Sequence, residues 1–253
     1  MAVMGYRKTE VANAFLEYQR SLALYQLSLE SRAFSAPQPL RADTAARALE
    51  LERLPPGLPL RDAFARAALG LTDRRLVGTG FRDAGVALAS IHNIGARGRQ
   101  GFSSYSGAAS AGSGAFRAHG DFWVGNVWVA ADGRIWIHDP VVAKRRHARA
   151  SELMSDPWSD LASFLFNLGV VHPLWLLPLI RQDWISECET AFLAGYRDEY
   201  RGVFDPSMIR EPIESTFQDY AAYLSGCGRR VRSSIRLRYA RRRLVSLQTV
   251  FRC

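Results

Sequence analysis

Cysteine is scarce in this sequence, and lysine is nearly absent. The three cysteines, Cys188, Cys227 and Cys253, are odd in number, lie far apart and form no Cys-x-x-Cys pair. The sequence therefore indicates neither a disulfide framework nor a cysteine-based zinc site, and it suits a reducing cytoplasm. Lys8 and Lys144 are the only lysines, so the basic charge comes almost entirely from arginine.

A long hydrophobic run is also missing. The most apolar stretch, 170–180, contains His172, Pro173 and Pro178 and is much shorter than the roughly 20 apolar residues that a membrane-spanning helix needs. The first residues lack the apolar core of a signal peptide. We therefore expect a cytoplasmic protein without export and without a membrane span.

Apolar residues are otherwise plentiful. They make up 48% of the 253 residues, which is enough for the core of one large domain or of two lobes. The formal net charge is +9, which favours anionic ligands such as nucleotides or acidic glycans. We expect a globular monomer or dimer.

Hydrophobic spacing predicts a chain whose C-terminal two-thirds is mainly helical. A first helix is expected from Thr9, as the N-cap, to about Leu29. After a linker that ends at Pro37 and Pro39, residues 48–54 are typical of a strand running into the turn at 55–57. Further helices are predicted at 60–69, 82–92, 157–168 (with Asp156 as N-cap), 183–200, 211–224 and 233–250, with loops at 98–114 and 141–155.

A short hairpin carries the most informative residues. The apolar runs 127–130 and 135–137 flank an Ala-Asp-Gly turn, so Asn126 and Asp139 lie at the open end of the hairpin. This geometry places Asp139 near Asp121 and Asn126. Two acids and an amide that converge suit Mg²⁺, which prefers oxygen ligands and keeps some waters for exchange with phosphate. The chemistry indicated is phosphoryl transfer.

Several motifs occur together in a fixed order along the chain. They cover most of it, from about residue 6 to residue 200, and the ordered set resembles the aminoglycoside phosphotransferase and choline kinase group. These are small-molecule kinases with a protein-kinase-like fold. The motifs are the helix with Glu17, Leu49-Glu-Leu-Glu-Arg-Leu-Pro-Pro-Gly57, Ala89-Ser-Ile-His92, His119-Gly-Asp-x4-Asn126, Ile-His-Asp139 and Asp156-Pro-x-x-Asp160-Leu-Ala.

The resemblance implies an α+β fold with two lobes. Residues 1–56 would form a small, incomplete N-lobe and hinge, and residues 57–253 a mainly helical C-lobe with the catalytic hairpin. Asp121 would be the catalytic base or positioning carboxylate for the acceptor hydroxyl. Asn126 and Asp139 would hold Mg²⁺ against the phosphates of ATP or GTP.

The same resemblance assigns supporting residues. His119 and Asp160 would be scaffolding, with Asp160 receiving backbone N–H bonds from the catalytic loop. Residues 51–54, including Glu52, Arg53 and Leu54, would line the adenine pocket through backbone groups. Lys8 and Glu17 are candidates for the ion pair that bridges the nucleotide phosphates. His92 and His138 are interpreted as structural.

The N-terminal part departs from this family pattern. The family has two strands with a phosphate-covering loop before the strand that carries its lysine, and these strands cannot be fitted before Val3. Lys8 lies at the predicted start of the helix that holds Glu17, and Met4 could occupy the lysine position instead. Three explanations stay open: a truncated gene model, a compact kinase that uses Lys8 or an arginine, and a degenerate relative that binds without catalysis.

The sequence is compatible with three functions. The first is an ATP-dependent phosphotransferase with an alcohol group as acceptor, acting on an aminoglycoside, a sugar or an amino alcohol. The second is a catalytically impaired pseudokinase or a nucleotide-binding or ligand-binding module. The third is binding to nucleic acid or to an anionic surface. No aromatic platform accompanies the C-terminal arginines, so a solvated basic helix face is favoured and no specific nucleic acid is expected. These arginines are Arg229, Arg230, Arg232, Arg236, Arg238, Arg241, Arg242 and Arg243.

Overall fold

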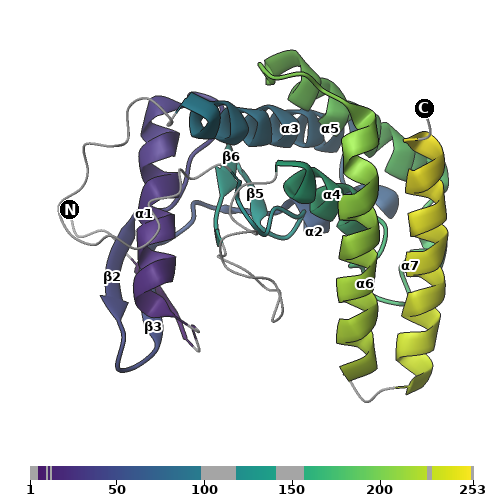
Figure 1. The fold of residues 1–253 in the computed structure, drawn as a ribbon, viewed down its shortest axis with the longest axis horizontal. Coiled ribbons are helices and arrows are strands. Elements are labelled where there is room, and N and C mark those ends of the chain that lie inside the picture. The colour runs from purple at the N-terminus through teal and green to yellow at the C-terminus, as the bar shows by residue number, and fades with distance from the viewer. Residues whose placement is uncertain are drawn as a thin grey trace.

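The structure, a computed structural model, describes residues 5–9, 11, 13–97, 118–140, 157–226 and 230–251. The loops predicted at 98–114 and 141–155 lie outside these residues, as do Met4 and the predicted N-cap Asp156. The described chain is α+β (Figure 1). Its elements are β1 (Gly5–Lys8), α1 (Ala14–Glu30), β2 (Pro39–Asp43), β3 (Ala48–Glu52), β4 (Gly57–Pro59), α2 (Leu60–Ala68), α3 (Arg74–Arg97), β5 (Val127–Ala130), β6 (Ile135–Ile137), α4 (Pro157–Leu168), η2 (Leu177–Leu179), α5 (Gln182–Glu199), η3 (Pro206–Ile209), α6 (Arg210–Gly226) and α7 (Arg230–Val250).

The first sheet has three antiparallel strands in the order β1-β3-β2. Its central strand β3 alternates buried and half-buried side chains, as expected for a strand with one face covered. Leu49 and Leu51 of β3 pack with Val11 and Ala14 in a small core under α1. Figure 1 shows α1, β2 and β3 gathered on one side of the molecule.

The second sheet contains the predicted hairpin. The strands expected at 127–130 and 135–137 are confirmed as β5 and β6, which pair antiparallel and are joined through Gly133 at a φ of +85°. Strand β4 adds to the other edge of β5, where a Cβ on Gly57 would lie 2.2 Å from the Val129 carbonyl oxygen. Only glycine fits so close to the neighbouring backbone.

The two parts of the chain are joined by more than the linker at 53–56. Ser35, which follows α1, forms a parallel bridge with Trp136, and its N–H donates to the Ile135 carbonyl at 2.9 Å. Leu24, Leu27 and Phe34 also belong to the large core of the helical part. Helix α1 therefore packs on both cores, although the first sheet ends before the boundary expected at residue 56.

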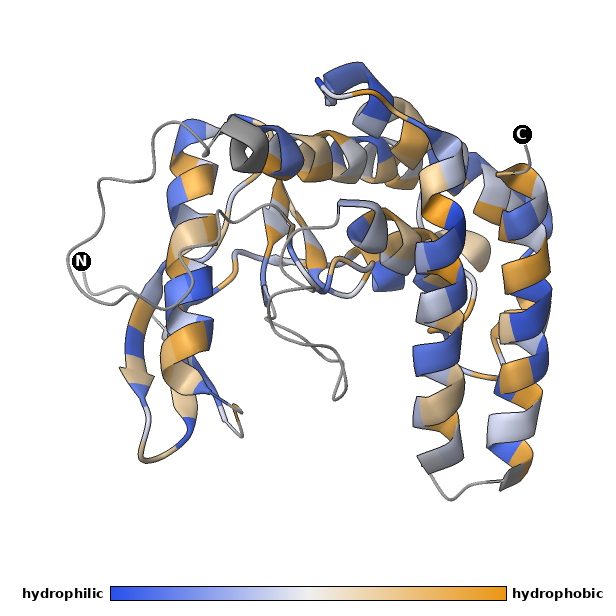
Figure 2. Cartoon of the chain, viewed as in Figure 1, coloured by the Kyte–Doolittle hydropathy of each residue, from blue (hydrophilic) through white to orange (hydrophobic). Residues whose placement is uncertain are grey.

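The large core lies between the second sheet and the helices α2 to α5. Buried aromatic rings belong to it, and the helices around it carry both hydrophobic and hydrophilic residues (Figure 2). Phe164 stacks on Phe192 with ring centroids 3.9 Å apart, and Phe122, the residue after Asp121, packs against both rings. The loop that carries Asp121 is therefore anchored directly in the core.

Helices α3 and α5 approach unusually closely. A Cβ added to Gly85 of α3 would lie 2.1 Å from the Phe192 carbonyl oxygen, and one added to Gly195 of α5 would lie 2.1 Å from the Arg82 carbonyl oxygen. Both contacts are too short for any side chain. The two glycines therefore permit the backbones to touch.

Several predicted element boundaries were wrong. Helix α1 begins at Ala14 with Asn13 as N-cap, whose Oδ1 accepts from the Leu16 N–H, so Thr9 is not the cap. The reason is that the preceding residues pair with β3 as a strand. Helix α3 is longer than the predicted 82–92. Strand β2, which was not predicted, begins at Pro39, where the predicted linker ends, and the proline is tolerated because it begins an edge strand.

The C-terminal hairpin of α6 and α7 covers α4 on the side of the molecule opposite to α1 (Figure 1). Arg238, Arg241 and Arg242 of α7 are exposed, as a solvated basic face requires. Arg243 is an exception, because it is buried, ion-paired with Glu189 and bonded to the Leu165 carbonyl oxygen. None of the described helices is long and apolar enough to cross a bilayer.

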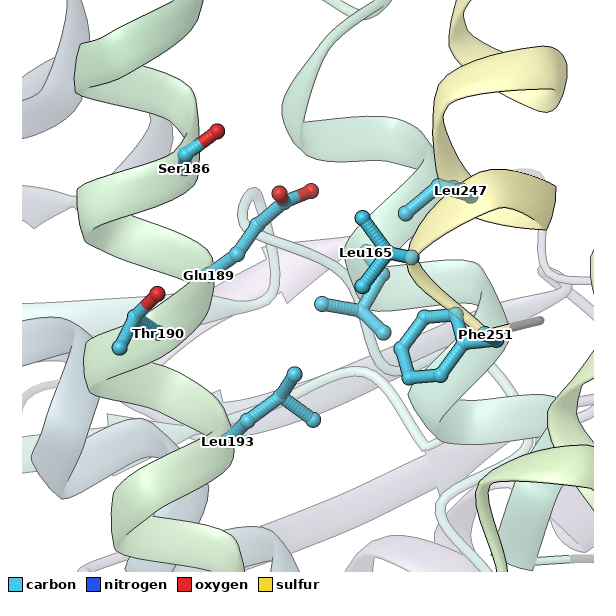
Figure 3. Close-up of a pocket in the computed structure, with 8 residues that line it drawn as sticks. Leu165, Ser186, Glu189, Thr190, Leu193, Leu247 and Phe251 are labelled. Carbon is cyan, nitrogen blue, oxygen red and sulfur yellow. The ribbon is translucent and has the colours of Figure 1, made fainter. Parts of the chain in front are cut away.

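A small cavity of about 100 Å³ adjoins this buried ion pair (Figure 3). Glu189, Ser186 and Thr190 of α5 form its polar wall, and apolar side chains from α4, α5 and α7 form the rest. The cavity therefore lies among the outer helices of the C-terminal part. Its apolar residues are Leu165, Leu193, Leu247, Val250 and Phe251.

Candidate active site

The loop that connects Ala118 to β5 is folded tightly around Asp121. The Asn126 side chain donates from Nδ2 to the Asp121 backbone oxygen at 2.9 Å and to its carboxylate Oδ2 at 3.1 Å. The Asn126 N–H also donates to the Trp123 carbonyl oxygen at 2.9 Å. These bonds fix the amide, and they place its oxygen at the end of the group that points away from Asp121.

The hairpin brings the residues after β6 back to this loop. The His138 N–H donates to the Asn126 carbonyl oxygen at 3.2 Å, and the next residue is Asp139. Asp139 has a φ of +55°, a left-handed conformation that few residues other than glycine adopt. Aspartate adopts this conformation more readily than most other residues, so a residue other than glycine is tolerated after β6.

Lys8 links the first sheet to the hairpin. Its Nζ lies 3.0 Å from Glu17 Oε2 and 3.3 Å from Asp139 Oδ1, with all three side chains partly buried. The prediction that Lys8 lies at the start of the helix was wrong. It is the last residue of β1, opposite Leu49, and this position directs it at both carboxylates.

The charges in this cluster stabilise one another. Burial alone would raise the pKa of Asp139, but His138 and Lys8 outweigh it and hold that pKa far below its usual range. Burial alone would lower the pKa of Lys8, but Asp139 and Glu17 outweigh it and hold that pKa above its usual value. Asp139 is therefore an anion and Lys8 a cation at every physiological pH.

Asp160 holds the loop that carries Asp121 through two backbone N–H groups. Its Oδ2 accepts from the His119 N–H at 2.6 Å, and its Oδ1 accepts from the Gly120 N–H at 2.9 Å. Burial would raise the pKa of Asp160, but His92 and His119 outweigh it, so the carboxylate stays ionised. Gly120 has a φ of +83°, which glycine adopts without strain.

His119 is fully buried. Its Nε2 lies 3.1 Å from the His138 carbonyl oxygen, which ties the loop to the residue before Asp139. Burial lowers the pKa of His119 to about 4, so the ring is neutral at physiological pH. The structure thus places His119 at the junction of the loop and the hairpin.

The predicted adenine-lining residues lie where β3 leaves the first sheet. Glu52 exchanges backbone and side-chain bonds with Gln38, Arg53 is exposed, and Leu54 is half-buried. Glu52 also pairs with Gly5 on β1, the strand that ends at Lys8, whereas Arg53 and Leu54 follow the end of β3. They form the connection between the two sheets.

The donor set fits a magnesium ion better than a transition metal. The described residues contain no group of three His, Cys, Asp or Glu side chains that could hold a metal. Magnesium does not need such a group, because it is usually bound by one or two protein oxygens, with waters and phosphates supplying the rest. Asp139 is ionised and already accepts a cation, the Lys8 ammonium, and Asn126 offers an amide oxygen.

Sequence reasoning missed two residues beside this cluster. Tyr6 lies two positions before Lys8 on β1, and burial and then Asp139 raise the pKa of its hydroxyl. Arg20 lies one turn after Glu17 on α1, and its burial lowers the pKa of its guanidinium, which the charge of Asp160 partly offsets. The two-residue spacing on a strand and the three-residue spacing on a helix place each on the same face as a predicted residue, which could have identified both.

Comparisons with known proteins complete this description. No protein-family model matches the chain, and no curated protein matches it. Among solved structures, a crystal structure of a glucosamine kinase is similar with a TM-score of 0.57 and 16% sequence identity, over 97% of this chain and 71% of that chain. At this identity the similarity concerns the fold alone. The chain is therefore similar in fold to a glucosamine kinase.

Proposed function

We propose that this protein is a phosphotransferase that moves the γ-phosphoryl group of ATP or GTP to a hydroxyl group of a sugar or amino sugar. The observation that carries the proposal is the position of Lys8, which contacts both Glu17 and Asp139. A lysine held between a helix carboxylate and a metal-binding carboxylate is the arrangement that kinases use to hold nucleotide phosphates. The membership of the aminoglycoside phosphotransferase group and its two-lobed arrangement are part of this proposal.

Each residue has a defined task in the proposed reaction. Lys8, oriented by Glu17, binds the nucleotide phosphates. Asp121, fixed by Asn126, accepts the hydrogen bond of the acceptor hydroxyl and takes its proton as the new P–O bond forms and the bond from the γ-phosphorus to the β–γ bridging oxygen breaks, which releases ADP or GDP. Asn126 and Asp139 would hold Mg²⁺, which when bound neutralises negative charge on the phosphates.

The structural neighbour supports the choice of acceptor class in this proposal. The neighbour is named a glucosamine kinase, so amino sugars and sugars are the first acceptors to test, ahead of amino alcohols and aminoglycosides. The net charge of +9 does not favour a strongly cationic acceptor such as an aminoglycoside. A sugar with one amino group or none is the better candidate.

The test is nucleotide turnover by the full chain. Formation of ADP or GDP would be measured with and without Mg²⁺ against glucosamine, other hexoses and hexosamines, choline and aminoglycosides. We expect Mg²⁺-dependent turnover with at least one sugar or amino sugar. In Asp121→Asn, which keeps the shape of the side chain, turnover should fall by about 100-fold or more.

Two outcomes would contradict the proposal. Nucleotide binding without turnover on any acceptor would instead favour a pseudokinase or binding module. Turnover that is unchanged in Asp121→Asn would remove Asp121 from the reaction. Asp132→Asn is the matched control, because Asp132 lies in the exposed turn of the same hairpin and should leave turnover unchanged.

A further inference from the structure

A chain of buried polar groups runs from α5 to the catalytic loop. The Tyr196 hydroxyl lies 2.9 Å from His92 Nδ1, and His92 Nε2 lies 3.3 Å from Asp160 Oδ2. All three residues are at most 2% exposed, so solvent does not replace any of these bonds. Unlike Asp160, neither Tyr196 nor His92 has a task in the reaction proposed above.

The charge of Asp160 determines the direction of the hydrogen bonds. The ionised carboxylate is only an acceptor, so His92 Nε2 must carry the proton that is shared with it. When the ring carries only this one proton, His92 Nδ1 is an acceptor and the Tyr196 hydroxyl donates to it. The hydroxyl of Tyr196 therefore selects the one ring tautomer of His92 that can donate to Asp160.

The chain continues to the catalytic carboxylate. Asp160 accepts from the Gly120 N–H at 2.9 Å, and Gly120 directly precedes Asp121. We propose that Tyr196 is a positioning residue that holds Asp121 in place through His92 and Asp160. This assignment rests on the proposed function, in which Asp121 receives the acceptor hydroxyl.

Tyr196 is itself held firmly in place. It follows Gly195, whose missing side chain lets α5 touch the backbone of α3, the helix that carries His92. Its ring stacks on Tyr200 with centroids 5.0 Å apart and meets His92 edge to face at 5.6 Å. Beside it, Asn93 bonds to the Glu199 carbonyl and the Arg201 N–H, which fixes α3 to the end of α5.

The first measurement is hydrogen exchange in the full chain without substrate. Tyr196→Phe removes only the hydroxyl oxygen and leaves His92 Nδ1 without this donor. We expect exchange of the His119 and Gly120 amides to accelerate about tenfold, as for the loss of one buried hydrogen bond. Amides in the middle of α7 should change by less than twofold. Tyr200→Phe is the control and should leave the loop amides unchanged.

A double-mutant cycle tests whether the effect passes through His92. His92→Gln keeps an N–H donor for Asp160 but removes the ring nitrogen to which Tyr196 donates. In that background Tyr196→Phe should change loop exchange by less than twofold, because the two side chains no longer interact. Nitrogen shifts of His92 should show a proton on Nε2 in the wild type and a changed tautomer ratio in Tyr196→Phe.

Turnover measurements then distinguish a failure of the positioning role of Tyr196 from a failure of the proposed function. With an active acceptor, Tyr196→Phe should lower kcat about tenfold and leave the KM for ATP within twofold. If the wild type shows no turnover at all, the exchange and tautomer results still decide the positioning role. Equal acceleration at α7 and at the loop, unchanged loop exchange, or an undiminished effect in the His92→Gln background would each overturn it.

Discussion

At the scale of single residues, the strand and the helix on either side of Lys8 determine which side chains it contacts. Strand β1 ends at Lys8, and α1 begins at Ala14, so Glu17 lies in the first turn of the helix and faces back toward the strand. The hairpin supplies the second carboxylate, Asp139, from a distant part of the chain. One ammonium group thus joins three elements of the fold.

Replacement of Lys8 should separate catalysis from folding. In Lys8→Met we expect kcat/KM for ATP to fall by about 100-fold, because a preorganised cation no longer meets the phosphates. Thermal unfolding should shift to a lower temperature only modestly, because Glu17 and Asp139 lose their shared cation but keep some access to solvent. Steady-state kinetics and a melting curve measure both effects.

Arg7 provides the matched control for this substitution. It precedes Lys8 on β1, and its ion pair with Asp43 is half exposed. Alternate residues of a strand face opposite sides of the sheet, so Arg7→Met should leave kcat/KM for ATP within twofold. Equal losses in the two variants would argue against a specific task for Lys8.

At the scale of elements, the contact between α3 and α5 determines where the catalytic loop is held. Gly195→Ala places a Cβ against the Arg82 carbonyl and should destabilise the protein by about 1–3 kcal/mol. It should also displace Tyr196 and accelerate exchange of the catalytic-loop amides. Urea unfolding and hydrogen exchange measure the two effects.

Helix α3 also contains a glycine whose replacement should stabilise the protein. Nothing lies within 4 Å of a Cβ built on Gly78, so Gly78→Ala should stabilise the protein by about 0.5–1 kcal/mol through helix propensity alone. If Gly195→Ala proved as harmless as Gly78→Ala, the helices would not be in the close contact described above.

The helices and the catalytic hairpin could be predicted from the sequence, because their apolar periodicity extends over enough residues. The short strands β1, β2 and β4 could not. Four residues such as 5–8 carry too little alternation to distinguish a strand from the start of a helix. Only their pairing with β3 identifies them as a strand. The proline that begins β2 argued for a linker, but an edge strand tolerates it.

The candidate site was predictable in part for the same reason. Asp121, Asn126 and Asp139 belong to one local hairpin, so their spacing alone brings them together. The contacts of Lys8 depend on a strand register that the sequence does not contain. The proposed role of Tyr196 depends on the close contact of α3 and α5 at two glycines, and no local sequence pattern predicts this contact.

At the scale of the whole molecule, two buried histidines make stability depend on pH. Burial lowers the pKa of His119 and of His172 to about 4 each, from an unfolded value of 6.5. Because the folded-state pKa is the lower one, their contribution is complete above pH 6.5 and is lost as the pH falls toward 4. Each contributes on the order of 3 kcal/mol over this interval.

His172→Gln should make the protein more tolerant of acid. His172 Nε2 bonds to the Leu168 carbonyl, and the glutamine amide can donate there without titrating. We expect the free energy of unfolding to fall less between pH 6.5 and 4 than in the wild type, as measured by urea titration at each pH. The same loss in both proteins would show that His172 does not contribute to the pH dependence.

The ion pair between Lys8 and Asp139 also has a consequence for folding kinetics. The two residues are 131 positions apart, whereas α6 and α7 meet through a short connection. Closing so long a loop costs chain entropy that is recovered only when most of the core is in place. The helical hairpin can thus form early, and the lysine meets its carboxylate last. A chain still folding can contain nearly all its helices and yet lack the contact between Lys8 and Asp139.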